Sequence, residues 1–206
     1  MKIEIKKSLK PVNYEKAISL LEKKMHNVDK NNSNEFLWIL KHPEVFTAGT
    51  SYKSNEVIDK SIKIIKTSRG GKITWHGPGQ LICYFVIDLK KRKKDIRYMI
   101  KIIEKIIIQT LESYNIKSFG DKKNIGIWVK DKNKFKKIAA IGIKIKKWIA
   151  FHGFSINIDN KLEPYNKILP CGMNKDKVTT LKRYKNKNYK DIDKILIKNF
   201  IKNFQI

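Results

Sequence analysis

The chain has 206 residues, of which 41% are apolar, so it is long enough to bury a hydrophobic core without disulfides or metals. Its formal net charge is +27, from 46 basic and 19 acidic residues. The sequence contains no signal-peptide pattern and no apolar run near 20 residues, which argues against export and against a membrane-spanning helix. We expect a single domain, residues 1–206, in the cytoplasm.

The basic charge has three interpretations. Nearly all of it is lysine, spread along the whole chain, and only four arginines occur. Lys, Ile and Asn have A/T-rich codons, so a compositional bias is the interpretation we favour. Docking of acidic protein partners comes second, and nucleic-acid binding, which favours clustered basic residues, comes last. We therefore expect neither a nucleic-acid partner nor a membrane partner.

The first half of the chain predicts one helix followed by three strands. Residues 14–28 carry Ala17, Leu20, Leu21 and Met25 on one helical face, with Asn13 as the N-cap. Runs of β-branched and aromatic residues predict strands at 36–40, 62–67 and 81–89. The last run is apolar throughout, which is typical of a strand buried on both faces.

The second half predicts a long helix, three strands and a final helix. Apolar residues at steps of three or four predict helices at 95–113 and 191–204. A short strand is expected at 124–129. Alternation on both sides of Lys146 and Lys147 predicts a β-hairpin over 137–158, although its turn lacks an Asn-Gly pair. Since the elements do not alternate as βαβ units, we expect an α+β fold with a mixed, largely antiparallel β-sheet flanked by helices.

The two cysteines occupy different settings. Cys83 lies in the apolar run 81–89 and is expected to be a small buried hydrophobe. Cys171 lies between Pro170 and Gly172, in a predicted loop where a thiol is exposed and reactive. In an unexported chain we expect no disulfide between them.

The predicted hairpin bears on the surroundings of Cys171. A turn near Lys146 places Lys137 across from about Ile156. About a dozen residues follow the hairpin before Cys171, enough to bring it back over Lys137. A neighbouring ammonium lowers the pKa of a thiol, and the thiolate is the nucleophile. Because lysines are so numerous, the spacing alone does not select Lys137.

The stretch "RGGKITWHGPGQ", residues 69–80, holds four of the ten glycines in the chain. It lies between two predicted strands, whereas phosphate-binding glycine loops lead into a helix. Paired glycines let a backbone approach a ligand closely, and Arg69 could bind an acid or cap a carbonyl. His76 sits in a rigid turn, either solvated or facing a ligand. His26, His42, His76 and His152 lie in unrelated contexts, so we expect no metal site.

Four blocks together resemble the lipoyl(octanoyl) transferase family of lipoate biosynthesis. They are "KHPEVFTAGT" at 41–50, "RGGKITWHGPGQLICYFVIDLKK" at 69–91, "KIAAIGIKIKKWIAFHGFSINI" at 137–158, and "LPCGM" with "VTTL" at 169–181. They occur in the family's order and span about residues 36–181. The resemblance implies a fold similar to the catalytic domain of biotin and lipoate protein ligases, which agrees with the predicted α+β sheet.

The resemblance implies acyl transfer through a thioester. Cys171 would take an octanoyl group from octanoyl-acyl carrier protein. The group would then pass to the ε-amine of a lysine on lipoyl domains, those of 2-oxoacid dehydrogenases and the glycine cleavage H protein, in the first step of protein lipoylation. Lys137 matches the lysine that lowers the cysteine pKa and moves protons, as a charge or as a base. No ATP, metal or other cofactor is implied, and we expect a monomer.

By the same resemblance, three segments bind the acyl substrate. Their residues are Arg69, Gly70, Gly71, Lys72, Ile73, Thr74, Trp75, His76, Ala140, Ile141, Gly142, Gly153, Phe154 and Ser155. We expect Gly70 and Gly71 to let backbone pass close to the acyl chain, and Trp75 and His76 to close the pocket. His76 either shapes this pocket or polarises the thioester carbonyl, and we favour shaping.

Two positions depart from the family's common pattern, and two other functions stay open. Trp75 replaces an expected tyrosine, and Thr50 stands where arginine is more usual, which puts the role of that arginine in doubt. The first alternative is an ATP-dependent lipoate or biotin protein ligase, which needs no nucleophilic cysteine. The second is a basic module that binds RNA or a carrier protein without catalysis, with strongly salt-dependent binding.

Overall fold

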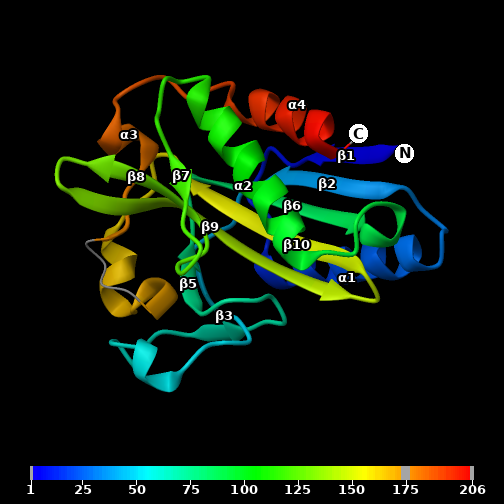
Figure 1. Ribbon diagram of the computed structural model, residues 1–206. Coiled ribbons are helices and arrows are strands. Elements are labelled where there is room, and N and C mark those ends of the chain that lie inside the picture. Colours follow the sequence, from blue (N-terminus) through cyan, green and yellow to red (C-terminus); the bar gives the residue numbers. More distant parts are fainter. Residues whose placement is uncertain (1, 173–176, 205–206) are drawn as a thin grey trace.

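The computed structural model describes residues 2–172 and 177–204, apart from the side chain of Cys171. A seven-stranded sheet in the order β1-β2-β6-β10-β9-β8-β7 forms its centre (Figure 1). The strands are β1 (Ile3–Lys7), β2 (Glu35–Leu40), β6 (Gln80–Asp88), β7 (Phe119–Gly120), β8 (Ile127–Asp131), β9 (Lys134–Lys146) and β10 (Ile149–Asn157). Only β1 and β2 pair in parallel, and every other neighbouring pair is antiparallel.

Helices cover both faces of this sheet. They are α1 (Tyr14–Asp29), α2 (Ile96–Glu112), α3 (Leu181–Tyr184) and α4 (Ile192–Phe204). Side chains of β6 alternate between the two faces, which explains its unbroken apolar run: Cys83 and Phe85 pack with α2 and α4, whereas Tyr84 and Val86 pack with α1. The predicted α+β class with a mixed, largely antiparallel sheet is confirmed.

A second, three-stranded sheet lies beside the main one, with β3 in its middle (Figure 1). Its strands are β3 (Val45–Ala48), β4 (Ile64–Lys66) and β5 (Ile73–His76). Four 3-10 helices complete the described elements: η1 (Ser54–Glu56), η2 (Leu89–Lys91), η3 (Glu163–Lys167) and η4 (Pro170–Gly172). A small core of Ile73, Trp75, Tyr165, Ile168 and Val178 joins this sheet to η3 and the turn that carries Cys171.

The three long helices begin and end close to the residues predicted. The Asn13 side chain accepts a hydrogen bond from the Lys16 backbone N–H at 3.1 Å, so the predicted N-cap of α1 is confirmed. Asp95 caps α2 in the same way, accepting from the Tyr98 N–H at 2.9 Å. None of the described helices is long and apolar enough to cross a bilayer.

The hairpin β9–β10 forms, with its turn one residue later than expected. Lys147 and Trp148 occupy the turn with φ of 50° and 61°, so it has the left-handed geometry that Asn-Gly usually supplies. Moving the turn by one residue changes the partner of each β10 residue on β9 by two positions. Ile156 therefore pairs with Ala139, and the expected pairing of Ile156 with Lys137 is wrong.

Four strands were missed, namely β1, β3, β5 and the two-residue β7, and one strand begins later than predicted. β1 is short and rich in lysine, and its pairing with β2 is decided by tertiary contact. β3 pairs with β4 and β5, and β5 pairs only with β3, so both strands belong to the small sheet. β5 lies inside the glycine-rich motif, whose glycines hide its alternating pattern. The strand expected at 124–129 begins at Ile127.

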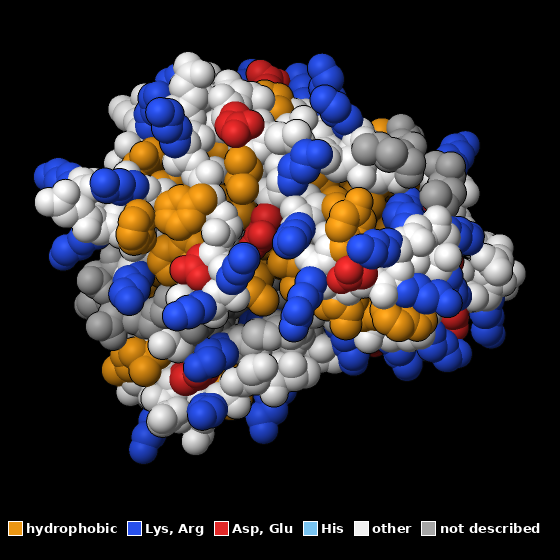
Figure 2. All heavy atoms as spheres, viewed as in Figure 1, with side chains coloured by type: hydrophobic (Ala, Val, Ile, Leu, Met, Phe, Trp, Pro, Cys, Tyr) orange, Lys and Arg blue, Asp and Glu red, His pale blue; other side chains and the backbone are white. Residues whose placement is uncertain are grey.

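Lysine and arginine side chains are spread over the whole face of the molecule seen in Figure 2, between hydrophobic and polar side chains. The dispersion of lysine along the sequence is thus kept on this face of the folded surface.

Candidate active site

Arg69 fastens the glycine loop to the small sheet. Its guanidinium is buried, and Nη2 donates to the backbone oxygen and to Oγ1 of Thr47, both at 2.9 Å. Its Nη1 donates to the backbone oxygen of Gly70 at 3.0 Å. Of the two roles considered for Arg69, the carbonyl-capping role is the one these contacts provide, although its side chain also reaches the wall of the cavity described next.

A narrow cavity of about 50 Å³ lies between the glycine loop and strands β5, β6, β9 and β10. Eleven of the fourteen predicted substrate-binding residues line it: Arg69, Gly71, Lys72, Thr74, His76, Ala140, Ile141, Gly142, Gly153, Phe154 and Ser155. Segments distant in sequence thus meet at one cavity, which we call the acyl cavity after the ligand that the sequence resemblance predicts for these residues.

Gly70, Ile73 and Trp75 do not line the acyl cavity. Gly70 packs against β9: its N–H donates to the Ile143 oxygen at 3.0 Å, and a methyl group there would lie 2.8 Å from that oxygen. Side chains of β5 alternate, so Thr74 and His76 face the cavity while Ile73 and Trp75 enter the small core. The close backbone approach allowed by Gly70 is therefore made to another strand.

Two residues of the cavity wall were missed. Ile82 and Tyr84 project from β6 on the same face as its neighbours on β10. Alternate residues of the strand predicted at 81–89 lie on one face, so the sequence could have indicated Ile82 and Tyr84 together. It could not show that this face meets the glycine loop. A hydrogen bond to buried His42 holds the Tyr84 side chain in place, because the Tyr84 hydroxyl lies 2.9 Å from Nε2 of His42. Nδ1 of His42 in turn donates to the Val12 oxygen at 2.6 Å.

His76 is a buried, neutral side chain in the cavity wall. The Gln80 amide nitrogen donates to Asn157 Oδ1 at 2.9 Å and to the Trp75 oxygen at 3.3 Å. The amide oxygen of Gln80 therefore accepts from Nδ1 of His76, at 3.1 Å. Burial, with help from the nearby His42 and Arg69, lowers the pKa of His76 to about 3. At neutral pH this imidazole is uncharged.

His42 and His76 lie close together, with ring centroids 6.0 Å apart. The expectation that the four histidines occupy unrelated contexts is wrong for this pair. Strand β3 follows His42 and pairs with β5, which ends at His76, so tertiary pairing joins them. In the described parts of the chain, no three His, Cys, Asp or Glu side chains form a group that could hold a metal ion.

A second small cavity adjoins the acyl cavity and shares Thr74, Ala140 and Ser155 with it. Its other lining residues are Lys137, Asn157, Tyr165, Pro170 and Val178. The fold thus brings the backbone that precedes Cys171 to the same place as Lys137, the arrangement expected from the sequence.

Lys137 is only 5% exposed. Its ammonium lies 5.3 Å from the Trp128 ring centroid, and no hydrogen bond or ion pair to it is formed within the described residues. The Lys137 backbone oxygen accepts from the Thr179 N–H at 3.0 Å, and Val178 bridges to Lys137 in parallel. The chain that leaves the turn of Cys171 is thereby fastened to β9 at Lys137.

Cys171 lies in η4, which packs against β5. Its side chain is outside the described residues, so its distance from Lys137 stays a prediction. The turn itself is closed by the Gly172 N–H, which donates to the Leu169 oxygen at 2.9 Å, with Gly172 at φ +73°. Cys83 is fully buried, which raises the pKa of its thiol well above the ordinary value and confirms its predicted place in the core.

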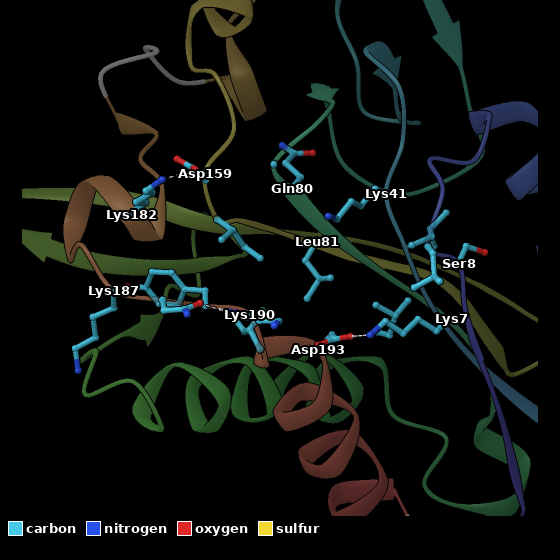
Figure 3. Close-up of a pocket in the computed structure, with 18 of the residues that line it drawn as sticks. Lys7, Ser8, Lys41, Gln80, Leu81, Asp159, Lys182, Lys187, Lys190 and Asp193 are labelled. Carbon is cyan, nitrogen blue, oxygen red and sulfur yellow. Dashed lines mark hydrogen bonds and ion pairs between the residues drawn. The ribbon is translucent and has the colours of Figure 1, made fainter.

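A much larger cavity, of about 850 Å³, lies elsewhere (Figure 3). It opens between the start of α4, where Lys7 pairs with Asp193, and α3, where Lys182 pairs with Asp159, and none of the predicted site residues line it. Size alone would favour this cavity, whereas the convergence of the predicted segments favours the acyl cavity as the candidate site.

The sequence and the fold were compared with those of known proteins. A family model described as the lipoyl protein ligase A/B catalytic domain matches residues 13–202. A curated octanoyltransferase of Wolbachia sp. subsp. Brugia malayi is 42% identical over 198 residues, covering 94% of this chain and 95% of its own. One of Anaplasma phagocytophilum is 39% identical over 207 residues, covering 99% and 100%.

The chain belongs to the octanoyltransferase family. It is accordingly an acyltransferase, as its sequence blocks indicated. Among solved structures, a T. acidophilum protein assigned as a lipoate protein ligase, with bound lipoic acid, superimposes with a TM-score of 0.79 at 16% identity, covering 100% of this chain and 87% of that one.

Lipoate-protein ligase A bound with ATP gives a TM-score of 0.73 at 16% identity, covering 98% of this chain and 86% of that one. Biotin protein ligase of Aquifex aeolicus, in complex with biotin and ATP, gives 0.54 at 12%, covering 98% and 70%. At these identities the similarity concerns the fold, and it confirms the expected relation to the ligase catalytic domains.

Proposed function

We propose that this member of the octanoyltransferase family transfers an octanoyl group from octanoyl-acyl carrier protein to the ε-amine of a lysine on lipoyl domains. The acceptors would be the lipoyl domains of 2-oxoacid dehydrogenases and the glycine cleavage H protein. The observation that carries the proposal is the meeting of Lys137 with the turn of Cys171 at the end of the acyl cavity, in a chain about 40% identical to curated octanoyltransferases.

In the first half-reaction the Cys171 thiolate attacks the thioester carbonyl of the donor. The new bond joins Sγ to the acyl carbon, and the bond to the carrier's sulfur breaks. The departing thiolate takes a proton that Lys137 supplies. Exchange of one thioester for another is nearly balanced in free energy, so this loading is reversible.

In the second half-reaction the neutral amine of the acceptor lysine attacks the Cys171 thioester. An amide forms, the thiolate of Cys171 leaves, and the proton lost by the attacking nitrogen returns to Lys137. Since Lys137 lacks a carboxylate partner among the described residues, its charge acts on Cys171 without internal neutralisation. Amide formation drives the overall transfer, and neither half-reaction calls for ATP.

The acyl cavity supports selection of a short apolar chain. His76 is neutral, and Ile82 and Ala140 supply apolar wall. Each methylene removed from water contributes about 0.8 kcal/mol, so cavity depth discriminates chain length. At about 50 Å³ the cavity is smaller than the ~150 Å³ that admits benzene, and an eight-carbon chain requires its walls to move.

We also propose that residues 1–206 form one catalytic domain acting as a cytoplasmic monomer. The hydrophobic core supports the single domain, because one cluster of buried residues includes both Ile3 of the first strand and Phe204 of the last helix. Acidic donor and acceptor proteins would approach through long-range attraction to the lysine-rich surface, mainly through a faster association rate.

The first prediction is an acyl-enzyme at Cys171. Wild-type protein mixed with octanoyl-acyl carrier protein should gain one octanoyl group by intact mass, and hydroxylamine should remove it. Cys171→Ser should show no labile adduct and lose transfer to a lipoyl domain, because an alcohol is not ionised at neutral pH. Transfer by Cys171→Ser at the wild-type rate would sink the mechanism, and transfer that requires ATP and free octanoate would indicate a ligase.

A further inference from the structure

Lys72 lies against the turn that carries Cys171. A methyl group on Gly172 would lie 2.4 Å from Lys72 Nζ and 3.1 Å from its Cε, so the ammonium sits directly over the Gly172 Cα. Consecutive Cα atoms are about 3.8 Å apart, so this ammonium is also close to the backbone of Cys171. Lys137 is therefore not the only lysine at this turn.

The ammonium of Lys72 is paired with a buried carboxylate. Its Nζ lies 2.6 Å from Oε1 of Glu56, whose side chain is 4% exposed. The backbone oxygen of Glu56 accepts from the Leu169 N–H at 2.7 Å, and Val57 bridges to Ile168. One segment thus holds both the carboxylate and the strand of chain that leads into the turn of Cys171.

The two charges of this pair act on a nearby thiol with opposite signs. A cation stabilises the thiolate and lowers the thiol pKa, and an anion raises it. At separations of a few ångströms in a protein, one unit charge is worth about one pKa unit or more. While Lys72 and Glu56 are paired their effects largely cancel, so removing either charge releases the effect of the other.

Other titratable groups also surround the turn. Lys137 on β9 supplies an unneutralised ammonium, and His76 on β5 is uncharged at neutral pH. Tyr165 on η3 lines the cavity with Lys137. Lys167 pairs with Asp59 at 3.2 Å, and Lys177 is exposed.

We propose that the Lys72–Glu56 ion pair sets the reactivity of Cys171 together with Lys137. Lys72 favours the thiolate, and Glu56 limits how far the thiol is ionised while holding Lys72 over the turn. Both residues change the ionisation of the Cys171 thiol and do not themselves react with the substrate, so they are positioning residues. The inference rests on the proposed role of Cys171 as nucleophile and goes beyond it, because it assigns a second source of charge at the turn.

The second prediction is that the two partners shift thiol reactivity in opposite directions. Alkylation of Cys171 by iodoacetamide is followed against pH in the full chain, with Cys171→Ser measuring the background from buried Cys83. At pH 6.5, Lys72→Met should react about threefold or more slowly than wild type, and Glu56→Gln about threefold or more quickly. The double variant should return close to the wild-type profile.

Matched variants separate charge from structure. Lys72→Arg keeps the cation and should retain the wild-type profile. Lys182→Met and Asp159→Asn break an exposed ion pair at the large cavity and should leave the profile unchanged. If Lys72→Met and Glu56→Gln shift the profile the same way, or if neither moves it, the proposal is wrong.

Alkylation does not need an octanoyl donor, so this outcome is independent of acyl transfer. A protein that forms the Cys171 acyl-enzyme without opposite shifts would refute the inference alone. Opposite shifts without an acyl-enzyme would refute the proposed function while the ion pair keeps its effect on the thiol.

Discussion

At the scale of single residues, burial decides the charge of the histidines near the site. His152 lies in β10 at φ +69°, and its Nε2 lies 3.3 Å from Ser68 Oγ. Burial is the largest cause that lowers its pKa to about 3, with Arg69 and Lys144 adding to the effect. His76 has the same pKa for a similar reason. Both side chains are thus uncharged at neutral pH, and His76, which lines the acyl cavity, is suited to shaping a neutral wall.

The third prediction follows from these lowered pKa values. In the unfolded chain both histidines take up a proton near pH 6.5, whereas in the folded chain they do so only near pH 3. Their contribution to stability is therefore complete above pH 6.5 and is lost as the pH falls toward 3. The free energy of unfolding should decrease by about 1.4 kcal/mol per pH unit for each histidine in this range.

Urea unfolding at pH 7.5 and pH 5.0 measures this loss, which should be about 4 kcal/mol for the two residues. His152→Asn tolerates the positive φ and does not titrate, so it should lose roughly half of the pH dependence. Equal stability at both pH values in the wild type would contradict the assignment.

At the scale of elements, close backbone contact between neighbouring strands decides where glycine is needed. Gly153 pairs with Tyr84 on β6 and with Gly142 on β9. A methyl group on Gly153 would lie 1.9 Å from the Cys83 backbone oxygen, and that oxygen belongs to a central strand. The glycine keeps β10 against β6 at the floor of the acyl cavity.

The fourth prediction is that Gly153→Ala is destabilising. The added methyl group has no room and forces β10 away from β6, which should cost about 2 kcal/mol or more. Chemical denaturation gives the loss, and Ser155→Ala on the same strand, which adds no atoms, should lose less. A Gly153→Ala variant as stable as wild type would show that the strands can separate at little cost.

At the scale of the whole molecule, one buried ion pair joins the central sheet to the end of the last helix. Arg92, which follows β6, contacts both carboxylate oxygens of Glu35 at the start of β2, with Nη2 2.7 Å from Oε2. The same guanidinium donates to the Phe204 oxygen at 3.0 Å, where α4 ends. Glu35 also accepts from the Asp88 N–H at 2.8 Å. The sheet and the final helix are fastened at this point.

The fifth prediction is that Glu35→Gln lowers the free energy of unfolding by about 3 kcal/mol, because Arg92 then remains buried beside a neutral amide. Urea denaturation measures the loss. Asp191→Asn breaks the exposed pair with Lys194 and should make no measurable difference. Similar losses in the two variants would show that burial of the Glu35–Arg92 pair carries no special weight.

The sequence by itself determined the long helices and the hairpin, and it predicted most of the residues that line the acyl cavity. Helices α1, α2 and α4 and the hairpin follow from apolar periodicity, which is a local property. The glycine-rich motif and the blocks around Lys137 and Cys171 were sufficient to indicate the family. Local pattern therefore predicted the fold class, and the resemblance of these blocks indicated the acyltransferase family.

Tertiary structure alone decided which side of each segment faces the site. Trp75 turned into the small core because β5 alternates, and Tyr84 entered the cavity wall because β6 presents that face to the glycine loop. The approach of His42 to His76, and of Lys72 and Glu56 to the turn at Gly172, depends on strand pairing between distant segments. Side-chain direction and long-range pairing are fixed only when the core is packed, so periodicity in one segment could not reveal them.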